Sequence, residues 1–188
     1  GSSAGSASAT AAGLCAFSIG TETLGSIISP SVRCGIVGLR PTFGRVGRSG
    51  GMTLCWSLDK IGPICRSTED TAIVLNALNG FDSKDPASIA TNFAYENQLD
   101  ISQLKIGYDP SSFTESTSQE LNRQILETVE SLGAQVSEIT LPEFDHRILP
   151  LQLEAEAAAA FEELTLGNRD DELRWQVDRA WPNTWRKA

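Results

Sequence analysis

Residues 20–30 read GTETLGSIISP and place a serine, Ser26, directly after a turn rich in glycine and threonine. Such a turn can expose several backbone N–H groups, and N–H groups aimed at one point stabilise an oxyanion. Ser26 is therefore a candidate nucleophile, which needs a partner to take its proton. The single histidine, His146, lies 120 residues away in EFDHRI, a setting typical of a surface loop and not of a triad.

The start of the chain offers other partners. Alanine dominates residues 3–13, and Gly13 can end a helix there, so a short helix of small residues is predicted. Its N-terminus would present free N–H groups and a partial positive charge near Ser2 and Ser3. This chemistry permits an acyl-transfer serine helped by other serines, although serine- and glycine-rich runs are more often plain turns and caps. Gly-Ser can also remain after tag removal, but the continuation SAGSASATAAG favours native sequence.

Further along the first half, residues 15–20 and 34–39 predict buried strands, and 60–66 predict an extended segment. Glycine-rich residues 40–58 between them predict a loop with short extended pieces. A helix is predicted from Ser67 to Gly80, where Ser67 and Asp70 form a capping-box pattern.

The second half alternates element types. Polar residues 81–102 predict a loop, and residues 104–109, 117–132 and 134–141 predict a strand, an amphipathic helix and a strand. This order is typical of a parallel β–α–β unit. Another helix is predicted over 151–166. The fold class is therefore α/β, with a mixed β-sheet core flanked by helices.

Composition limits the classes of function. The 188 residues are 40% apolar and 21% charged, as in an ordinary globular domain. Neither a membrane span nor a signal peptide is apparent, so a cytoplasmic protein without membrane contact is expected. The net charge is −9, and residues 1–66 carry six Lys/Arg against two acids. No dense basic patch exists, which argues against direct contact with nucleic acid.

The four cysteines follow no metal or redox pattern. Cys15, Cys34, Cys55 and Cys65 are spaced by 19, 21 and 10 residues, unlike the C-x-x-C motif. Cys15, Cys55 and Cys65 lie in apolar settings, so buried free thiols are predicted, and Cys34 is predicted in the core and not as a nucleophile. No metal and no cofactor are expected.

A long stretch of the chain resembles the amidase signature family. The resemblance rests on GSSAGSASATAAGLCAFSIGTETLGSIISPSVRCGIVGLRPTFGRV and continues through SLDKIGPICRSTEDTAIVLNAL. It is strong over roughly the first 80 residues and weaker beyond them. It implies one partial amidase domain over 1–188, with a signature core at 1–80 and a β–α–β and helical continuation at 81–188.

The resemblance also implies site residues. In that family a Ser–cis-Ser–Lys triad replaces Ser–His–Asp, and the nucleophile follows the cis serine by 24 positions, which is the spacing from Ser2 to Ser26. Ser3 would help by hydrogen bonding. Turn N–H groups would form the oxyanion hole, at Thr23, Leu24, Gly25 and Ser26. The implied reaction is hydrolysis of a small carboxamide through an acyl-enzyme, with Ser2 relaying the proton to a neutral lysine.

Several positions depart from the family pattern. Leu24 and Ile28 stand where glycine and arginine are frequent, so Glu22 lacks its usual partner, and Arg33 is the expected substitute. None of the four lysines occupies the catalytic lysine's motif, which lies upstream of the cis serine. The chain is therefore expected to be a fragment with little activity of its own. Beside a free chain end, the Gly1–Ser2 peptide bond is expected to be trans.

Three functions stay open at this stage. They are a stand-alone amidase, the A subunit of a tRNA-dependent amidotransferase that makes ammonia from glutamine, and a catalytically incomplete scaffold. The aliphatic Leu24 and Ile28 favour the first. A homodimer is left open. The C-terminal tryptophans Trp175, Trp181 and Trp185 are expected to pack against other parts of the fold.

Overall fold

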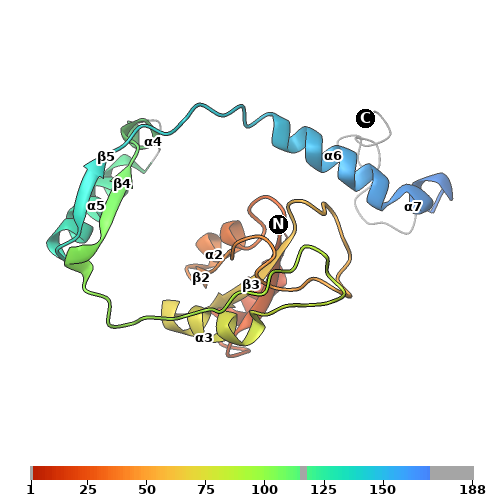
Figure 1. Cartoon of the computed structure of the whole chain (residues 1–188), viewed down its shortest axis with the longest axis horizontal. Coiled ribbons are helices and arrows are strands. Elements are labelled where there is room, and N and C mark those ends of the chain that lie inside the picture. The colour runs from red at the N-terminus through yellow and green to blue at the C-terminus, as the bar shows by residue number, and fades with distance from the viewer. Residues whose placement is uncertain (1, 115–117, 170–188) are drawn as a thin grey trace. The chain divides into compact units, whose positions relative to one another are not determined.

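The computed structural model describes residues 2–114 and 118–169 (Figure 1). They form two compact units: the first contains the chain up to Tyr95 and resumes at Arg147, and the second is Glu96–His146. The expected trans bond at Gly1, the cap at Thr117 and the packing of the C-terminal tryptophans lie outside the described residues. No helix among the described residues is long and apolar enough to cross a membrane.

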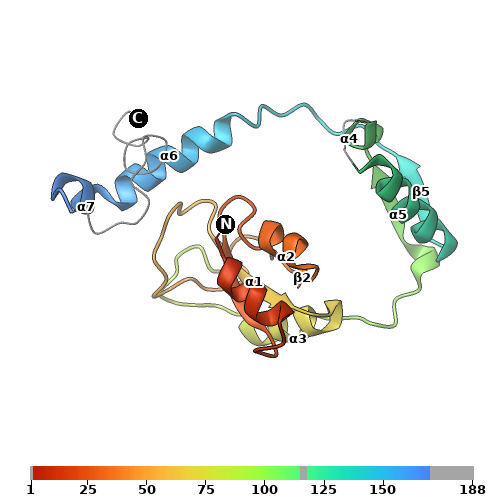
Figure 2. The same cartoon turned by 180° about the vertical axis from the view of Figure 1, so that it is seen from behind.

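A three-stranded antiparallel sheet organises the first unit. Strand β3 (Lys60–Cys65) lies in the middle, between β1 (Ser18–Glu22) and β2 (Val37–Gly38). In this register Gly20 lies opposite Gly62. Helices α1 (Ala4–Ala11) and α2 (Ile28–Cys34) pack together, and α1 also packs on the sheet, as Figure 2 shows from behind.

The core of this unit is small. Ala7 of α1, Ile27 before α2 and Ile64 of β3 are fully buried together, and Cys34 and Ile36 pack against them. A chain with glycine and alanine at the contacts lets helix and sheet backbones approach closely. A Cβ atom on Gly62, for example, would lie 2.3 Å from the carbonyl oxygen of Leu39.

Two strand predictions in this unit need correction. The first strand begins at Ser18 and not at residue 15, and the segment 34–39 forms a strand only at Val37–Gly38. Cys34 instead ends α2, where Gly35 adopts a left-handed backbone with φ 65°. The sequence gives no helix period over this short segment, so α2 was not predicted. Pro30 is tolerated because it lies in the first turn, where its missing N–H has no intrahelical partner to lose.

The predicted helix caps are confirmed. Helix α1 is followed by Gly13 with φ 72°, and helix α3 (Thr68–Leu78) is capped by Ser67, whose hydroxyl accepts from the Asp70 N–H at 3.1 Å. The loop predicted over 81–102 contains only a short 3₁₀ turn, η1 (Ile101–Gln103), near its end.

The second unit confirms the β–α–β prediction. Strands β4 (Lys105–Tyr108) and β5 (Gln135–Glu138) are parallel, with α5 (Gln119–Ser131) between them in the chain. A short helix, α4 (Pro110–Thr114), follows β4 and was not predicted.

The helix predicted over 151–166 is divided. It consists of α6 (Ile148–Ala160) and α7 (Glu162–Leu166), and the backbone of Phe161 between them is not helical. Together with the strands, these helices confirm the mixed α/β class.

All four cysteines are free, as predicted. Cys55 and Cys65 are fully buried, but Cys15 and Cys34 are partly exposed. The prediction that Cys15 is buried is therefore wrong, because it lies in the bend after α1 and not in a strand.

Replacing Gly62 by alanine is expected to destabilise the first unit by about 2 kcal/mol, because the added methyl group would overlap a backbone carbonyl and force the strands apart. Gly5→Ala is the matched control: its Cβ meets nothing within 4 Å, and alanine is the better helix former. Urea unfolding should lower the midpoint for Gly62→Ala only, and equal midpoints would contradict the close approach.

Candidate active site

The structure brings together the two serines that the sequence pairs. The Ser2 hydroxyl, just before α1, donates a hydrogen bond of 3.0 Å to the Ser26 hydroxyl. Ser26 lies in the turn between β1 and α2. The site therefore depends on how α1 is fixed against the end of β1.

Ser3 provides that attachment. Its hydroxyl donates to the Thr21 carbonyl and accepts from the Thr21 N–H, both at 3.2 Å. Ser3 also has a left-handed backbone, with φ 54°, which costs a residue with a side chain roughly 1–3 kcal/mol. The two bonds to Thr21 hold this conformation and keep Ser2 next to the turn.

The turn carries backbone donors without acceptors. Among the residues that the structure describes, none accepts a hydrogen bond from the N–H of Leu24 or of Ser26. Gly25 has φ 93°, a conformation that favours glycine. Its N–H differs from the other two because it contributes to stabilising the Glu22 carboxylate. Leu24 and Ser26 are thus two of the turn donors available to an anion.

Glu22 fixes the other side of the turn. Its carboxylate is 1% exposed and accepts from the N–H groups of Ile27 at 2.7 Å and Ile28 at 3.0 Å. Burial opposes the charged form, but these bonds, with help from Gly25 and Arg40, outweigh it and lower the pKa of Glu22. The cationic partner is Arg40, at 3.2 Å, and not Arg33 as expected. Arg33 lies in the last turn of α2, whereas Arg40 lies in the loop that follows β2, and its guanidinium contacts Glu22.

A cavity of about 670 Å³ opens beside Ser2 and Ser26. Its lining includes apolar side chains from the turn, from the loop after β2 and from α6: Leu24, Met52, Leu54, Trp56 and Leu153. Leu24 is 47% exposed and Met52 87% exposed, so these groups can contact a ligand. Hydroxyl groups and five charged residues line the cavity as well: Arg48, Asp59, Lys60, Lys84 and Asp85. A cavity of this size that combines apolar and polar groups suits a small organic molecule.

Arg48 links three segments of the cavity wall by hydrogen bonds. Its guanidinium donates two hydrogen bonds to the Asp85 carboxylate, at 2.9 and 3.0 Å, and two more to the carbonyls of Trp56 and Asp59. It also lies 4.7 Å from the centre of the Phe43 ring. The hydrogen bonds from Arg48 hold the pKa of Asp85 down at about 2.

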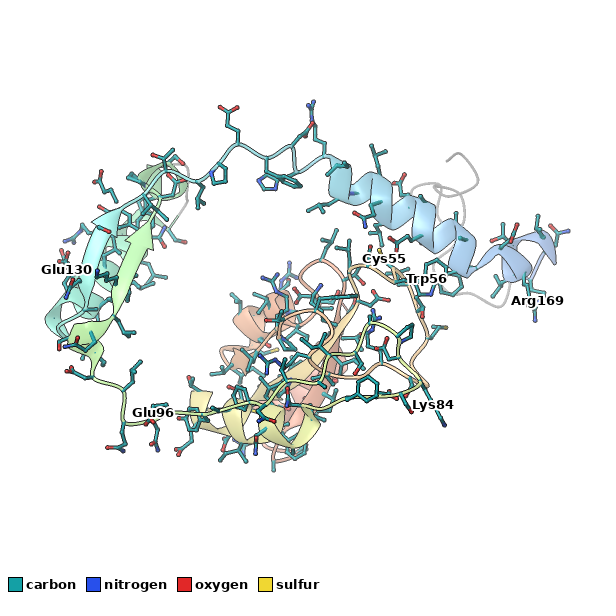
Figure 3. All side chains as sticks on the ribbon, in the orientation of Figure 1. Cys55, Trp56, Lys84, Glu96, Glu130 and Arg169 are labelled. Carbon is teal, nitrogen blue, oxygen red and sulfur yellow. The ribbon has the colours of Figure 1, made fainter. Side chains whose placement is uncertain are left out.

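Helix α6 is attached to the same loop through Glu156. Its carboxylate accepts from the Ser57 N–H at 3.0 Å and from the Cys55 thiol at 3.2 Å. Burial disfavours the charge, yet the bonds from Ser57, Cys55 and Gln152 lower the pKa of Glu156 to about 2. Figure 3 labels Cys55 and Trp56 on the part of the loop beside α6, and this contact brings Leu153 to the cavity.

Sequence reasoning missed the residues that support the serines. Arg40, Asp59 and Lys60 lie in the stretches that carry the resemblance, and Arg48 lies between those stretches. None was given a role, because each acts through a neighbour distant in the chain. The one usable signal was the family pattern, which pairs an acid at the position of Glu22 with a cation that this chain lacks at Ile28. It pointed to the correct interaction and the wrong arginine.

The family follows from comparison with known proteins. The model of the family described as Amidase matches residues 1–184 of this chain. The chain belongs to the amidase signature family. It is 45% identical over 148 residues to the A subunit of the glutamyl-tRNA(Gln) amidotransferase of Staphylococcus epidermidis. The aligned region covers 76% of this chain and 30% of that protein. The corresponding protein of Salinibacter ruber is 38% identical over 182 residues, covering 91% and 35%.

Solved amidase structures share the fold. The native peptide amidase of Stenotrophomonas maltophilia is 32% identical with a TM-score of 0.69, over 88% of this chain and 36% of that one. The A subunit of the glutamyl-tRNA(Gln) amidotransferase of Thermotoga maritima is 28% identical with a TM-score of 0.77, over 89% and 39%. The chain thus spans about 30–40% of the length of these amidase relatives.

The Arg48–Asp85 pair predicts a pH dependence of stability. The pKa of Asp85 is 3.8 ordinarily and about 2 in the fold, so its charge contributes about 2 kcal/mol above pH 3.8, and this is lost as the pH falls toward 2. Asp85→Asn should be less stable by about that amount at neutral pH, and the gap to wild type should narrow on acidification. Urea unfolding of both proteins across this pH range measures the difference in their free energies of unfolding. A difference that does not depend on pH would contradict the prediction.

Proposed function

We propose that the protein hydrolyses carboxamide C–N bonds through an acyl-enzyme on Ser26. The observation that carries this proposal is the 3.0 Å hydrogen bond between the Ser2 and Ser26 hydroxyls, beside a turn whose Leu24 and Ser26 N–H groups donate to no residue that the structure describes. Ser2, Leu24 and Ser26 line one cavity, and this supports their proposed roles as proton relay, anion donor and nucleophile.

In this mechanism Ser26 Oγ attacks the amide carbonyl carbon and its proton passes to Ser2 Oγ, whose own proton moves on to a base. The carbonyl oxygen becomes an oxyanion that accepts from the N–H groups of Leu24 and Ser26. Collapse of the tetrahedral intermediate breaks the C–N bond, and the amine leaves with a proton returned through Ser2. Water then attacks the ester on Ser26 and releases the acid.

The base in this scheme is a neutral lysine, by resemblance to the family. Among the described residues, no lysine forms a hydrogen bond with Ser2, and Lys60 donates to two backbone carbonyls instead. We therefore infer that the 188-residue chain by itself turns over unactivated amides slowly, since no lysine among the described residues is placed to receive the proton of Ser2.

The substrate is expected to carry an apolar acyl group. Leu24, Met52, Leu54 and Trp56 line the same cavity as Ser26, and burying apolar surface against them favours such a group by roughly 25 cal/mol per Å². This supports a stand-alone amidase.

A second candidate is the glutaminase reaction of the A subunit of an amidotransferase. The 45% identity to a relative of that name favours it. The two candidates differ in the amide that releases ammonia fastest, glutamine or an amide of an apolar acid, and a comparison of the two rates decides between them.

Acylation by an activated ester tests the nucleophile, because a good leaving group reduces the need for a base. Incubation with the p-nitrophenyl ester of butyric acid should add one acyl group to the wild-type chain, located at Ser26 by peptide mass spectrometry. Ser26→Ala should lose the adduct, and Ser2→Ala should form it more slowly, by about 100-fold.

Ser29→Ala is the matched control, because Ser29 is exposed and only three residues away in α2. It should be acylated like wild type. An adduct that persists in Ser26→Ala would refute the proposed nucleophile. If the wild-type chain turned over unactivated amides rapidly and Ser26→Ala abolished this activity, the inference that the chain lacks a base would be refuted.

A further inference from the structure

Asp59 and Lys60, at the start of β3, form hydrogen bonds with Thr23 in the turn after β1. Asp59 Oδ1 accepts from the Thr23 hydroxyl at 2.7 Å, and the Lys60 ammonium donates to the Thr23 carbonyl at 3.4 Å. Lys60 lies opposite Glu22 in the β1–β3 register, so the sheet itself directs it to the end of β1. Thr23 is therefore held at both its side chain and its backbone.

Asp59 and Lys60 are themselves fixed. The second oxygen of Asp59 accepts from the N–H groups of Leu54 and Cys55 at 2.8 and 2.9 Å, and the Asp59 carbonyl accepts from Arg48 at 3.1 Å. The Lys60 ammonium also donates to the Leu58 carbonyl. These contacts link the turn to the loop that forms the cavity wall.

The position of the Thr23 carbonyl determines the direction of the Leu24 N–H. The carbonyl belongs to the same peptide unit as the Leu24 N–H, and in a planar trans peptide the two groups point in opposite directions. A cation that holds the carbonyl oxygen therefore sets the direction of the N–H. It also withdraws electron density from the oxygen and makes the N–H a stronger donor, since linked hydrogen bonds polarise one another.

We propose that Lys60 is a positioning residue that orients and polarises the Thr23–Leu24 peptide, so that the Leu24 N–H can stabilise an oxyanion formed at Ser26. This inference rests on the proposed function. Lys60 acts as a donor to two carbonyls, which is a different role from that of a base toward Ser2.

Nuclear magnetic resonance tests the contact without any catalysis. In an HNCO spectrum one cross-peak correlates the Leu24 N–H with the Thr23 carbonyl carbon. Lys60→Met should shift that carbonyl upfield, because its hydrogen bond is lost, and Lys60→Arg should restore much of the wild-type position. Lys84→Met is the control: Lys84 also lines the cavity, but its side chain makes no hydrogen bond to the turn among the described residues.

Binding of two small molecules tests the functional consequence. A boronic acid such as phenylboronic acid can add to Ser26 as a tetrahedral anion, whereas benzamide mimics the neutral substrate. Direct loss of an oxyanion donor costs about 100- to 1000-fold, and a residue acting through the donor should cost less, so Lys60→Met should weaken the boronate by about tenfold. Binding of benzamide should change little, and Lys60→Arg should recover most of the boronate affinity.

The outcomes separate the two proposals. An unchanged Thr23 carbonyl shift in Lys60→Met overturns the inference about Lys60, whatever the ligands do. Equal weakening of the boronate and benzamide also overturns it, since that pattern indicates general damage to the cavity. Failure of the boronate to bind wild type counts against the serine chemistry, and the carbonyl shift still decides whether Lys60 holds the turn. If Lys60→Met does not fold, wild type is compared with Lys60→Arg instead. A boronate affinity that falls tenfold in Lys60→Arg while the Thr23 carbonyl chemical shift stays at its wild-type value would refute the role of Lys60 as a donor.

Discussion

The active-site half of the molecule depends on one buried charge. The Glu22 carboxylate ends β1 inside the fold, where an ionised group without partners would cost several kcal/mol. The N–H groups that start α2 and the guanidinium of Arg40 compensate it. The end of the strand and the start of the helix are therefore both bonded to this carboxylate, and the five residues between them form a tight turn that carries Ser26.

Close approach of backbones then completes the site. Gly20 has no side chain, and a Cβ atom there would lie 2.8 Å from Ile64 and 3.2 Å from the Ser3 hydroxyl. Since α1 can come this near to β1, Ser3 reaches the backbone of Thr21 and Ser2 reaches Ser26. The small residues that make the N-terminal segment look like a linker are thus what a two-serine site requires.

Local signals in the sequence were sufficient where an element depends on its own residues. The helix after Ser67 and the parallel β–α–β unit were predicted because capping and periodicity lie within each segment. Helix α2 was missed because its start depends on Glu22, which lies outside the helix. The resemblance to the amidase signature family led to the pairing of Ser2 with Ser26. The supports at Arg40 and Lys60 depend on strand pairing, which the sequence of either strand alone does not specify.

The cations around the turn share one function. Arg40 pairs with Glu22, Arg48 pairs with Asp85 and binds two carbonyls, and Lys60 binds the carbonyls of Thr23 and Leu58. Each positive charge is used as a donor that fixes backbone or a carboxylate, and such a use is lost if the group gives up its proton. Under the proposed function, these cations would help to orient donors toward negative charge at Ser26, and acceptance of the serine proton would be the task of another group.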